Sequence, residues 1–429
     1  MNTLWQPSLP EYYRSLPSER LAELISDRRR RLGDDLVILG HHYQTDEVVR
    51  HADFTGDSLK LSQLAAGVVK DKGSRYVVFC GVHFMAESAD MLTPETTQVI
   101  LPDLSAGCSM ADMASYDDTV EAWDLLHETL AEQGWTGRIV PITYVNSSAA
   151  IKAFVGAHGG ACCTSSNADR VFRWAMDGGT EPAGVRPGED VKILFLPDQH
   201  LGRNTAAGYG IDVARHSALY DPRKTARGEP LGGATPEQIL DAKVILWAGH
   251  CSVHKLFRPE HCDQIRAENA ARQARGEEPT RILVHPECAK EVVDKADLAG
   301  STEFIIQTLR DAPEGSRWAV GTEHHLVMRM ARECAARGVS VRILSDCQCL
   351  CTTMFRIDEP HLLWVLDGLC GIGAGLGRTA DKTTPEDFQR VTGEPVARNV
   401  IRVHPEVREP ALLALDRMLA LTAQPAAAV

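Results

Sequence analysis

Three cysteines, Cys347, Cys349 and Cys351, occupy alternate positions in the stretch RILSDCQCLCTTMF, directly after an apolar run and an acidic residue. Thiolates bind metal ions and act as nucleophiles, so the first question is which of the three holds a group. Zinc fingers and ribbons usually draw their cysteines from CxxC pairs, and the sequence contains none. At a spacing of two residues, one loop could use one or two of these thiols but not easily all three. A local zinc site is therefore one alternative.

A weak internal repeat suggests a second alternative. Three apolar runs, each followed by a short polar segment, lead to a cysteine: VILPDLSAGC ends at Cys108, VILWAGHC at Cys251 and RILSDCQCLC at Cys351. Ligands of open α/β sheets gather at the carboxyl ends of strands, so similar domains could aim these three loops at one site. Three thiolates fit an iron-sulfur cluster whose fourth iron has no protein ligand, an arrangement suited to Lewis acid catalysis. The third alternative is that the cysteines are small buried apolar residues.

Polar side chains also follow the apolar runs, where a purely structural core would reject them. His41 and Tyr43 follow LVILG, and His285 and Glu287 follow RILV with the same alternation. Burying such groups without partners costs about 1–3 kcal/mol each, so their concentration indicates a polar ligand. Hydrogen-bonded core pairs are the alternative for these residues, and N-capping is the alternative for the hydroxyls. The other polar positions are Ser58, Tyr144, Asn146, Ser165, His254, Ser301 and Thr302.

The elements that must position these residues read as alternating strands and helices. The apolar runs are short, rich in β-branched residues and without alternation, which is typical of strands buried on both faces of a parallel sheet. Helical patterns lie between them, at 58–73, 118–134 and 323–338. The sequence therefore predicts an α/β fold with parallel sheets. The runs are 36–39, 76–79, 98–101, 138–142, 191–196, 242–247, 281–284, 318–321 and 341–344.

Length and charge limit the class of protein. A chain of 429 residues predicts two or three domains, and a net charge of −13 argues against nucleic acid as a partner. We see no signal peptide and no apolar run long enough to span a membrane, so we expect a cytoplasmic protein that does not bind membranes. In a reducing compartment, the twelve cysteines do not form a disulfide framework.

The ordered blocks of the sequence resemble those of the quinolinate synthase family. They run from about Asp35 to Gly371 and read GHHYQTDEV, ADFTGDSL, CGVHFMAESADML, LPDLSAGCSMADM, YVNSSAAIKA, CTSSNA, LPDQHLGRN, WAGHCSVH, VHPEC, GSTEFII and GTEHHLV. The resemblance implies three similar α/β/α domains with short parallel sheets around a pseudo-threefold axis. It divides the chain into an N-terminal helical extension (1–33), domain 1 (34–118), domain 2 (119–262, with an insertion at 215–238), domain 3 (263–375) and a C-terminal helical segment (376–429).

The same resemblance implies a 4Fe-4S cluster at the centre, held by one cysteine from each domain and with one open iron. Carried over block by block, the ligands are Cys108, Cys251 and Cys351, the last because C-T-T-M matches the family pattern after the third ligand. Family members also space these cysteines as CxxCxxC, so CxCxC is a departure. Cys347 and Cys349 are then spectators or redox-active neighbours. A second departure is His42, where the family often has tyrosine.

The implied reaction condenses iminoaspartate with dihydroxyacetone phosphate to quinolinate, phosphate and water in de novo NAD biosynthesis. The functional partner is an L-aspartate oxidase or dehydrogenase that supplies iminoaspartate. The resemblance implies proton transfer by Glu287, Tyr43, His285 and His41, and substrate binding by Ser58, Tyr144, Asn146, Ser165, His254 and Thr302. Two rival interpretations are a mononuclear-metal lyase using Cys251, His254 and His285, and a metal-bound structural module using CxCxC.

Overall fold

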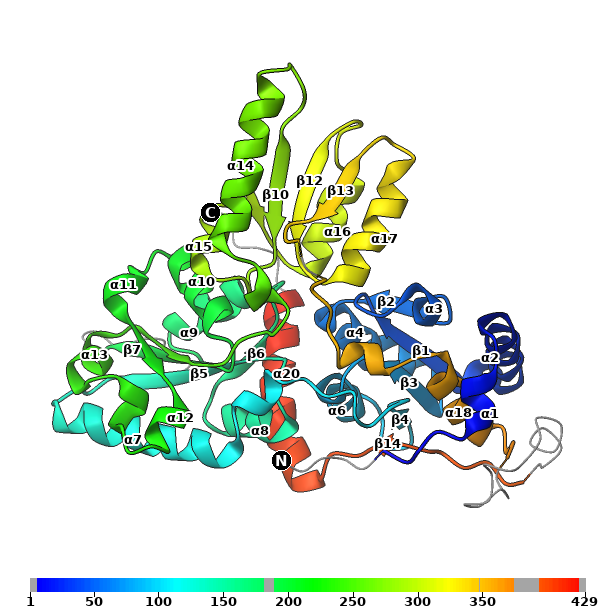
Figure 1. The fold of residues 1–429 in the computed structure, drawn as a ribbon. Coiled ribbons are helices and arrows are strands. Elements are labelled where there is room, and N and C mark those ends of the chain that lie inside the picture. Colours follow the sequence, from blue (N-terminus) through cyan, green and yellow to red (C-terminus); the bar gives the residue numbers. More distant parts are fainter. Residues whose placement is uncertain (1–5, 181–188, 347, 374–392, 424–429) are drawn as a thin grey trace. The chain divides into compact units, whose positions relative to one another are not determined.

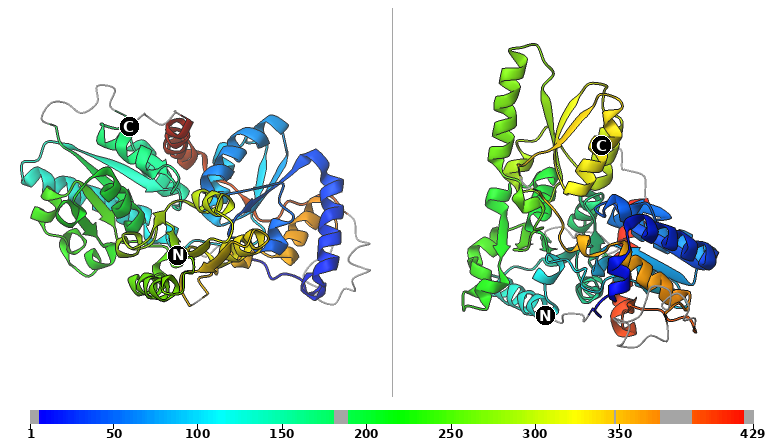
Figure 2. Two further views of the ribbon diagram at one scale, coloured as in Figure 1. Left: turned by 90° about the horizontal axis from the view of Figure 1, so that it is seen from above. Right: turned by 45° about the vertical axis from the view of Figure 1, so that its right-hand side comes forward.

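The computed structural model describes residues 6–180, 189–346, 348–373 and 393–423. Contacts group the chain into two compact units. Unit 1 comprises Met1–Cys108 and Cys351–Val403, and unit 2 comprises Ser109–Leu350 and His404–Val429. Strands and helices alternate in both units, and helices cover the faces of the sheets (Figures 1 and 2). The predicted α/β fold with parallel sheets is therefore confirmed.

Unit 1 contains a five-stranded sheet in the order β14-β4-β3-β1-β2. All pairs are parallel except that between β14 and β4. Every residue of β1 and β3 is buried, as expected for strands covered on both faces. The strands are β1 (Leu36–His41), β2 (Phe54–Gly56), β3 (Tyr76–Cys80), β4 (Gln98–Ile100) and β14 (Val400–Ile401). The helices are α1 (Glu11–Ser15), α2 (Ser18–Leu32), α3 (Asp46–Val49), α4 (Ser58–Leu64), α5 (Lys70–Lys72), α6 (His83–Leu92) and α18 (Glu359–Leu369).

Unit 2 contains two parallel sheets, a second in the order β6-β5-β7-β9-β8 and a third in the order β11-β10-β12-β13. The strands of the second are β5 (Arg138–Tyr144), β6 (Ala161–Cys163), β7 (Val191–Leu196), β8 (Ser217–Tyr220) and β9 (Val244–Trp247). Those of the third are β10 (Thr280–Val284), β11 (Leu298–Ala299), β12 (Arg317–Gly321) and β13 (Ser340–Ile343).

Helices connect the strands of unit 2 and cover its sheets. Those around the second sheet are α7 (Tyr116–Glu132), α8 (Ala149–Ala157), α9 (Ala168–Met176), α10 (Gln199–Tyr209), α11 (Val213–His216), α12 (Pro222–Thr225), α13 (Pro236–Asp241) and α20 (Pro405–Ala423). Those around the third are α14 (Pro259–Gln273), α15 (Lys290–Val293), α16 (Thr302–Arg310) and α17 (His324–Ala335).

The three sheets repeat one strand order. Counted across the sheet, four neighbouring strands have the same arrangement in each: β2-β1-β3-β4, β6-β5-β7-β9 and β11-β10-β12-β13. In the second sheet, β8 precedes β9 along the chain but lies beyond it in the sheet, so β9 is the fourth strand by position. Additional strands extend two of the sheets beyond the fourth strand: β14 in the first and β8 in the second. β8 lies within 215–238, which the sequence analysis takes for an insertion. The arrangement of the three sheets about one axis stays a prediction.

The ends of the described chain pack onto helices of their own units. In unit 2, Arg417 of α20 donates Nη1 to the carbonyl oxygens of Gly156 (3.0 Å) and Gly160 (2.6 Å), which ties α20 to the end of α8. In unit 1, Asp367 of α18 accepts from Arg28 Nε of α2 at 2.7 Å and from the Tyr13 hydroxyl of α1 at 3.1 Å. These buried contacts tie the terminal helices to the sheet-bearing units.

Candidate functional site

Cys108, Cys251 and Cys351 occupy the same topological position in the three sheets. Each follows the fourth strand of its repeat, β4, β9 or β13. Each is in irregular backbone, is followed by a two-residue turn, and has a 3₁₀ turn beginning three residues later. The 3₁₀ turns are Ala111–Met113, His254–Leu256 and Met354–Arg356. All three cysteines are partly exposed.

The other cysteines have different surroundings. Cys349 is fully buried, with Sγ 3.2 Å from Ser345 Oγ, and its carbonyl oxygen accepts from the backbone N–H of His324 at 3.0 Å. Cys347 lies outside the described residues. Burial raises the pKa of Cys80 and of Cys162 to about 12, which keeps these thiols protonated. Cys370 is partly exposed but lies at the end of α18 rather than after a strand. Of the two described cysteines of the CxCxC run, Cys351 is partly exposed and Cys349 is buried.

Within each unit, hydrogen bonds connect the segments around the cysteines. In unit 2, the turn after Cys108 contacts the approach to Cys251: Trp247 Nε1 donates to the carbonyl oxygen of Met113 at 2.7 Å. In unit 1, the turn after Cys351 contacts the approach to Cys108: Arg356 Nη1 donates to Ser105 Oγ at 3.1 Å. Each contact therefore holds the segments next to a candidate ligand within its own unit.

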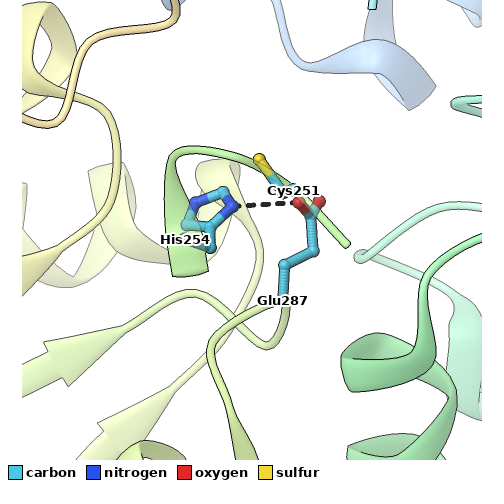
Figure 3. Close-up of side chains that lie close together, drawn as sticks. All are labelled: Cys251, His254 and Glu287. Atoms are coloured by element: carbon cyan, nitrogen blue, oxygen red, sulfur yellow. Dashed lines mark hydrogen bonds and ion pairs between the residues drawn. The ribbon is translucent and has the colours of Figure 1, made fainter. Parts of the chain in front are cut away.

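A buried polar cluster in unit 2 is centred on the carboxylate of Glu287. The Tyr144 hydroxyl donates to Oε1 at 2.5 Å, and His254 Nδ1 donates to Oε2 at 2.9 Å. Figure 3 shows His254, Glu287 and Cys251 pointing toward one another. The elements responsible are the end of β5, the 3₁₀ turn after Cys251 and the loop after β10.

His285 completes this cluster as a neutral imidazole. Its ring stacks on that of His254 at a centroid distance of 4.4 Å, and its Nδ1 accepts from the Glu287 backbone N–H at 3.3 Å. Burial, and next the adjacent His254, lower the pKa of His285 to about 3, although the carboxylate of Glu287 acts in the opposite direction. Burial raises the pKa of Glu287, but the adjacent His254 and hydrogen bonds from His254 and Tyr144 outweigh it and bring the pKa to about 2, so the carboxyl is ionised.

Two further buried residues, Asp198 and Thr322, make hydrogen bonds with Cys251 and His254; the sequence did not single them out. Asp198 is fully buried at the start of α10, where Oδ1 accepts from the Leu201 N–H at 2.7 Å and Oδ2 from the Cys251 N–H at 3.2 Å. Thr322, also fully buried, places Oγ1 3.2 Å from His254 Nε2. The signal for both was their place in polar blocks after strands, LPDQHLGRN and GTEHH.

His41 and Tyr43 lie together in unit 1. Their rings form a T-shaped contact at 4.7 Å, and His41 Nδ1 accepts from the Tyr43 backbone N–H at 3.1 Å. The neighbouring Gln44, fully buried, donates Nε2 to the carbonyl oxygen of Met354 at 3.1 Å. The loop after β1 is therefore attached to the turn that follows Cys351.

The predicted hydroxyl and amide ligands lie at or just before the starts of helices, Ser58 and Thr302 as the first residues of α4 and α16, and none of them is the cap residue. Asp57, not Ser58, caps α4, and Ser301, not Thr302, caps α16. Ser165 lies in the loop before α9, where Asn167 occupies the cap position. Asn146 has a buried Oδ1 with no hydrogen-bond partner among the described residues.

The fold and the site together define an α/β enzyme with a candidate metal-binding centre. Polar loops follow the strands of the parallel sheets, cysteines are partly exposed, and a buried carboxylate has histidine and tyrosine partners. The family model described as Quinolinate synthetase A protein matches residues 23–371. The chain belongs to this family of enzymes. No helix in the described ranges is long and apolar enough to cross a membrane.

Relatives match nearly the whole chain. It is 48% identical over 410 residues to the quinolinate synthase of Acidobacterium capsulatum, which covers 95% of both chains. It is 49% identical over 404 residues to that of Nocardioides sp. (94% of this chain and 89% of the relative). It is 45% identical over 411 residues to that of Streptomyces coelicolor (95% and 90%).

Proposed function

We propose that the chain condenses iminoaspartate with dihydroxyacetone phosphate to quinolinate, with release of phosphate and water, in de novo NAD biosynthesis. The family supports the activity. The observation that carries the proposal is the recurrence of an accessible cysteine after the fourth strand of all three sheets, together with the ionised, buried Glu287. An L-aspartate oxidase or dehydrogenase would supply the unstable iminoaspartate.

The proposed cofactor is a 4Fe-4S cluster on Cys108, Cys251 and Cys351. The donor set fits, because these thiols share one local conformation and are partly exposed, whereas Cys349 is buried. When bound, the cluster supplies an open iron that acts as a Lewis acid toward substrate oxygen or nitrogen. The repeated strand order supports three domains, for which we propose the bounds 34–118, 119–262 and 263–375. The described part of the segment 376–429, which the sequence predicts to be helical, contains helix α20 and also strand β14.

Glu287 is the proposed general base. Its carboxylate is ionised at neutral pH, and Tyr144 and His254 hold one oxygen each, so its orientation is set before substrate arrives. Tyr144 and His254 also bind substrate in this proposal. Neutral His285 accepts or donates a hydrogen bond without adding charge. His41 and Tyr43 provide a second proton-transfer pair after β1.

The remaining groups bind the anionic ends of the substrates. Ser58 and Thr302 are the first residues of α4 and α16, and Ser165 lies in the loop before α9; backbone N–H groups at such positions also favour phosphate or carboxylate oxygens. Asn146 offers an amide whose buried oxygen lacks a partner in the described structure. A substrate amine or hydroxyl would satisfy this oxygen.

The deciding experiment is anaerobic analysis of iron, sulfide, visible absorption and quinolinate formation. The wild type should be brown, with broad absorption near roughly 400 nm from iron-thiolate charge transfer. Cys108→Ala, Cys251→Ala and Cys351→Ala should lose cluster and product, whereas the matched control Cys349→Ala should keep both. A Cys351→Ala protein that kept its cluster would contradict the proposed ligand set, and a colourless, active wild type would contradict the cofactor.

A further inference from the structure

We infer that the cluster-free chain binds one zinc ion at Cys251, His254 and Glu287. One ligand atom from each residue, the thiol sulfur, a ring nitrogen and a carboxylate oxygen, lies within 4.8 Å of the others (Figure 3). In a tetrahedral site with bonds of about 2.0–2.3 Å, ligand atoms are about 3.3–3.8 Å apart. Small side-chain adjustments therefore suffice to surround an ion.

The types of ligand select the metal. A thiolate excludes magnesium and calcium, which prefer oxygen ligands alone, whereas zinc accepts sulfur, imidazole nitrogen and carboxylate oxygen. Cys251 and His254 are three residues apart on one turn, so two ligands come from a single short segment. With three protein ligands, the fourth position stays open to water or to a small anion.

Each of the three ligands has a contact that orients it. Thr322 Oγ1 lies 3.2 Å from His254 Nε2, which leaves Nδ1, the nitrogen that faces Glu287, for the ion. Tyr144 holds the other oxygen of Glu287 at 2.5 Å. Asp198 accepts from the Cys251 backbone N–H at 3.2 Å. Such outer contacts are typical of metal sites, because they fix the tautomer and the direction of the ligands.

Burial and access also favour an ion here. His254 is 1% exposed and Glu287 is 3% exposed, so an ion would be held away from competing water. Cys251 is partly exposed and provides a route of entry. Binding would replace the proton between His254 Nδ1 and Glu287 and release the thiol proton of Cys251.

A regulatory consequence rests on the proposed function. Zinc at this site would occupy Cys251, a proposed cluster ligand, and Glu287, the proposed general base. The zinc-loaded chain would then be unable to accept its cluster until the ion was removed. Zinc binding itself does not depend on the proposed function, so the two ideas can fail separately.

The test uses the full chain, freed of cluster and metal under anaerobic conditions, titrated with Zn²⁺ against a chromophoric chelator. We expect one tight ion per chain, with one sulfur and nitrogen or oxygen neighbours by X-ray absorption. His254→Gln, Glu287→Gln and Cys251→Ser should raise the dissociation constant at least tenfold, and Thr322→Val about tenfold. Circular dichroism confirms that each variant is folded.

The matched controls are Cys108→Ser and Cys351→Ser, which should bind zinc as the wild type does. Three sulfur neighbours, or loss of tight binding in these controls with retention in His254→Gln, would place zinc on the three cysteines and overturn the inference. Zinc-loaded wild type should also take up less iron and sulfide during anaerobic reconstitution, and chelation should restore uptake. Equal uptake with zinc still bound would refute the competition.

Discussion

Glu287 shows how neighbouring residues decide the state of one side chain. Burial raises the pKa of this carboxyl, but the adjacent His254 and hydrogen bonds from His254 and Tyr144 outweigh it and bring the pKa to about 2. Its partners come from segments 143 and 33 residues away in the chain, Tyr144 and His254. The result is a buried, ionised and oriented carboxylate, as a general base requires.

Replacing Glu287 by glutamine tests this role. The amide keeps the size of the side chain but cannot accept a proton, so quinolinate formation should fall about 10²–10⁴-fold while the cluster is retained. Glu291→Gln, on the exposed face of α15, is the matched control and should stay near wild type. Steady-state rates with iron content measured on the same samples check the prediction. A Glu287→Gln enzyme within threefold of wild type would exclude Glu287 as the base.

At the scale of elements, α18 is anchored at both ends within unit 1. Asp367 binds Arg28 and Tyr13 near its end, and Glu359 at its start accepts from Ser18 (2.8 Å) and Arg50 and pairs with His51 (2.7 Å). The helix directly follows the Cys351 loop. Its anchoring therefore limits how far that loop can move.

Removing the charge of Glu359 should loosen α18 in a pH-dependent manner. Burial raises the pKa of Glu359, but hydrogen bonds from His51, Arg50 and Ser18 outweigh it, so the net pKa is lowered. A lowered folded-state pKa means that the stabilisation is present above the unfolded value of about 4.3 and is lost as the pH falls through the folded value. At pH 7, Glu359→Gln should cost about 1.5–3 kcal/mol, the contribution of hydrogen bonds to a charged group.

Hydrogen exchange of α18 peptides measures this effect. Exchange in Glu359→Gln should be faster than in the wild type at neutral pH, and the two should converge as acid protonates the wild-type carboxyl. Glu47→Gln, exposed in α3, serves as the control and should leave α18 unchanged. A difference that persisted undiminished at low pH would show that the charge is not responsible.

The contact between α8 and α20 in unit 2 depends on a glycine. A Cβ at Gly156 would lie 1.9 Å from the carbonyl oxygen of Pro410 in α20. Gly156→Ala should therefore cost about 1–3 kcal/mol, as overpacking does, and make α20 more sensitive to proteolysis. Gly208→Ala in α10, where a Cβ meets nothing within 4 Å, should be neutral or slightly stabilising. Equal protease resistance of the two variants would argue against close packing of α20.

At the scale of the whole molecule, the proposed cluster ligands come from both units, Cys108 and Cys351 from unit 1 and Cys251 from unit 2. A group that binds only the native state stabilises it, by about 2.7 kcal/mol at a hundredfold excess over the dissociation constant. Chelation of the cluster should therefore lower the unfolding temperature of the wild type by several degrees. Anaerobic calorimetry checks this, and Cys351→Ala should show no difference with and without iron and sulfide.

The sequence by itself predicted the central strands of the sheets but missed five edge strands, β2, β6, β8, β11 and β14. Runs such as LVIL and VKILFL lie in β1 and β7, which are buried throughout, and burial on both faces is what removes alternation from a strand. It also placed polar residues after those strands, because loops at strand ends are where polar groups can meet a ligand. The family resemblance then named the candidate residues.

Only the tertiary structure distinguished residues with similar local sequence. Cys349 and Cys351 are two positions apart, yet Cys349 is buried against Ser345. Cys351 instead precedes a 3₁₀ turn at the same spacing as the turns that follow Cys108 and Cys251. Asp198 and Thr322 emerged as partners of Cys251 and His254 because folding brings together residues 53 and 68 positions apart. Burial and long-range hydrogen bonds depend on which chain segments pack together, and the local spacing of residues does not encode that.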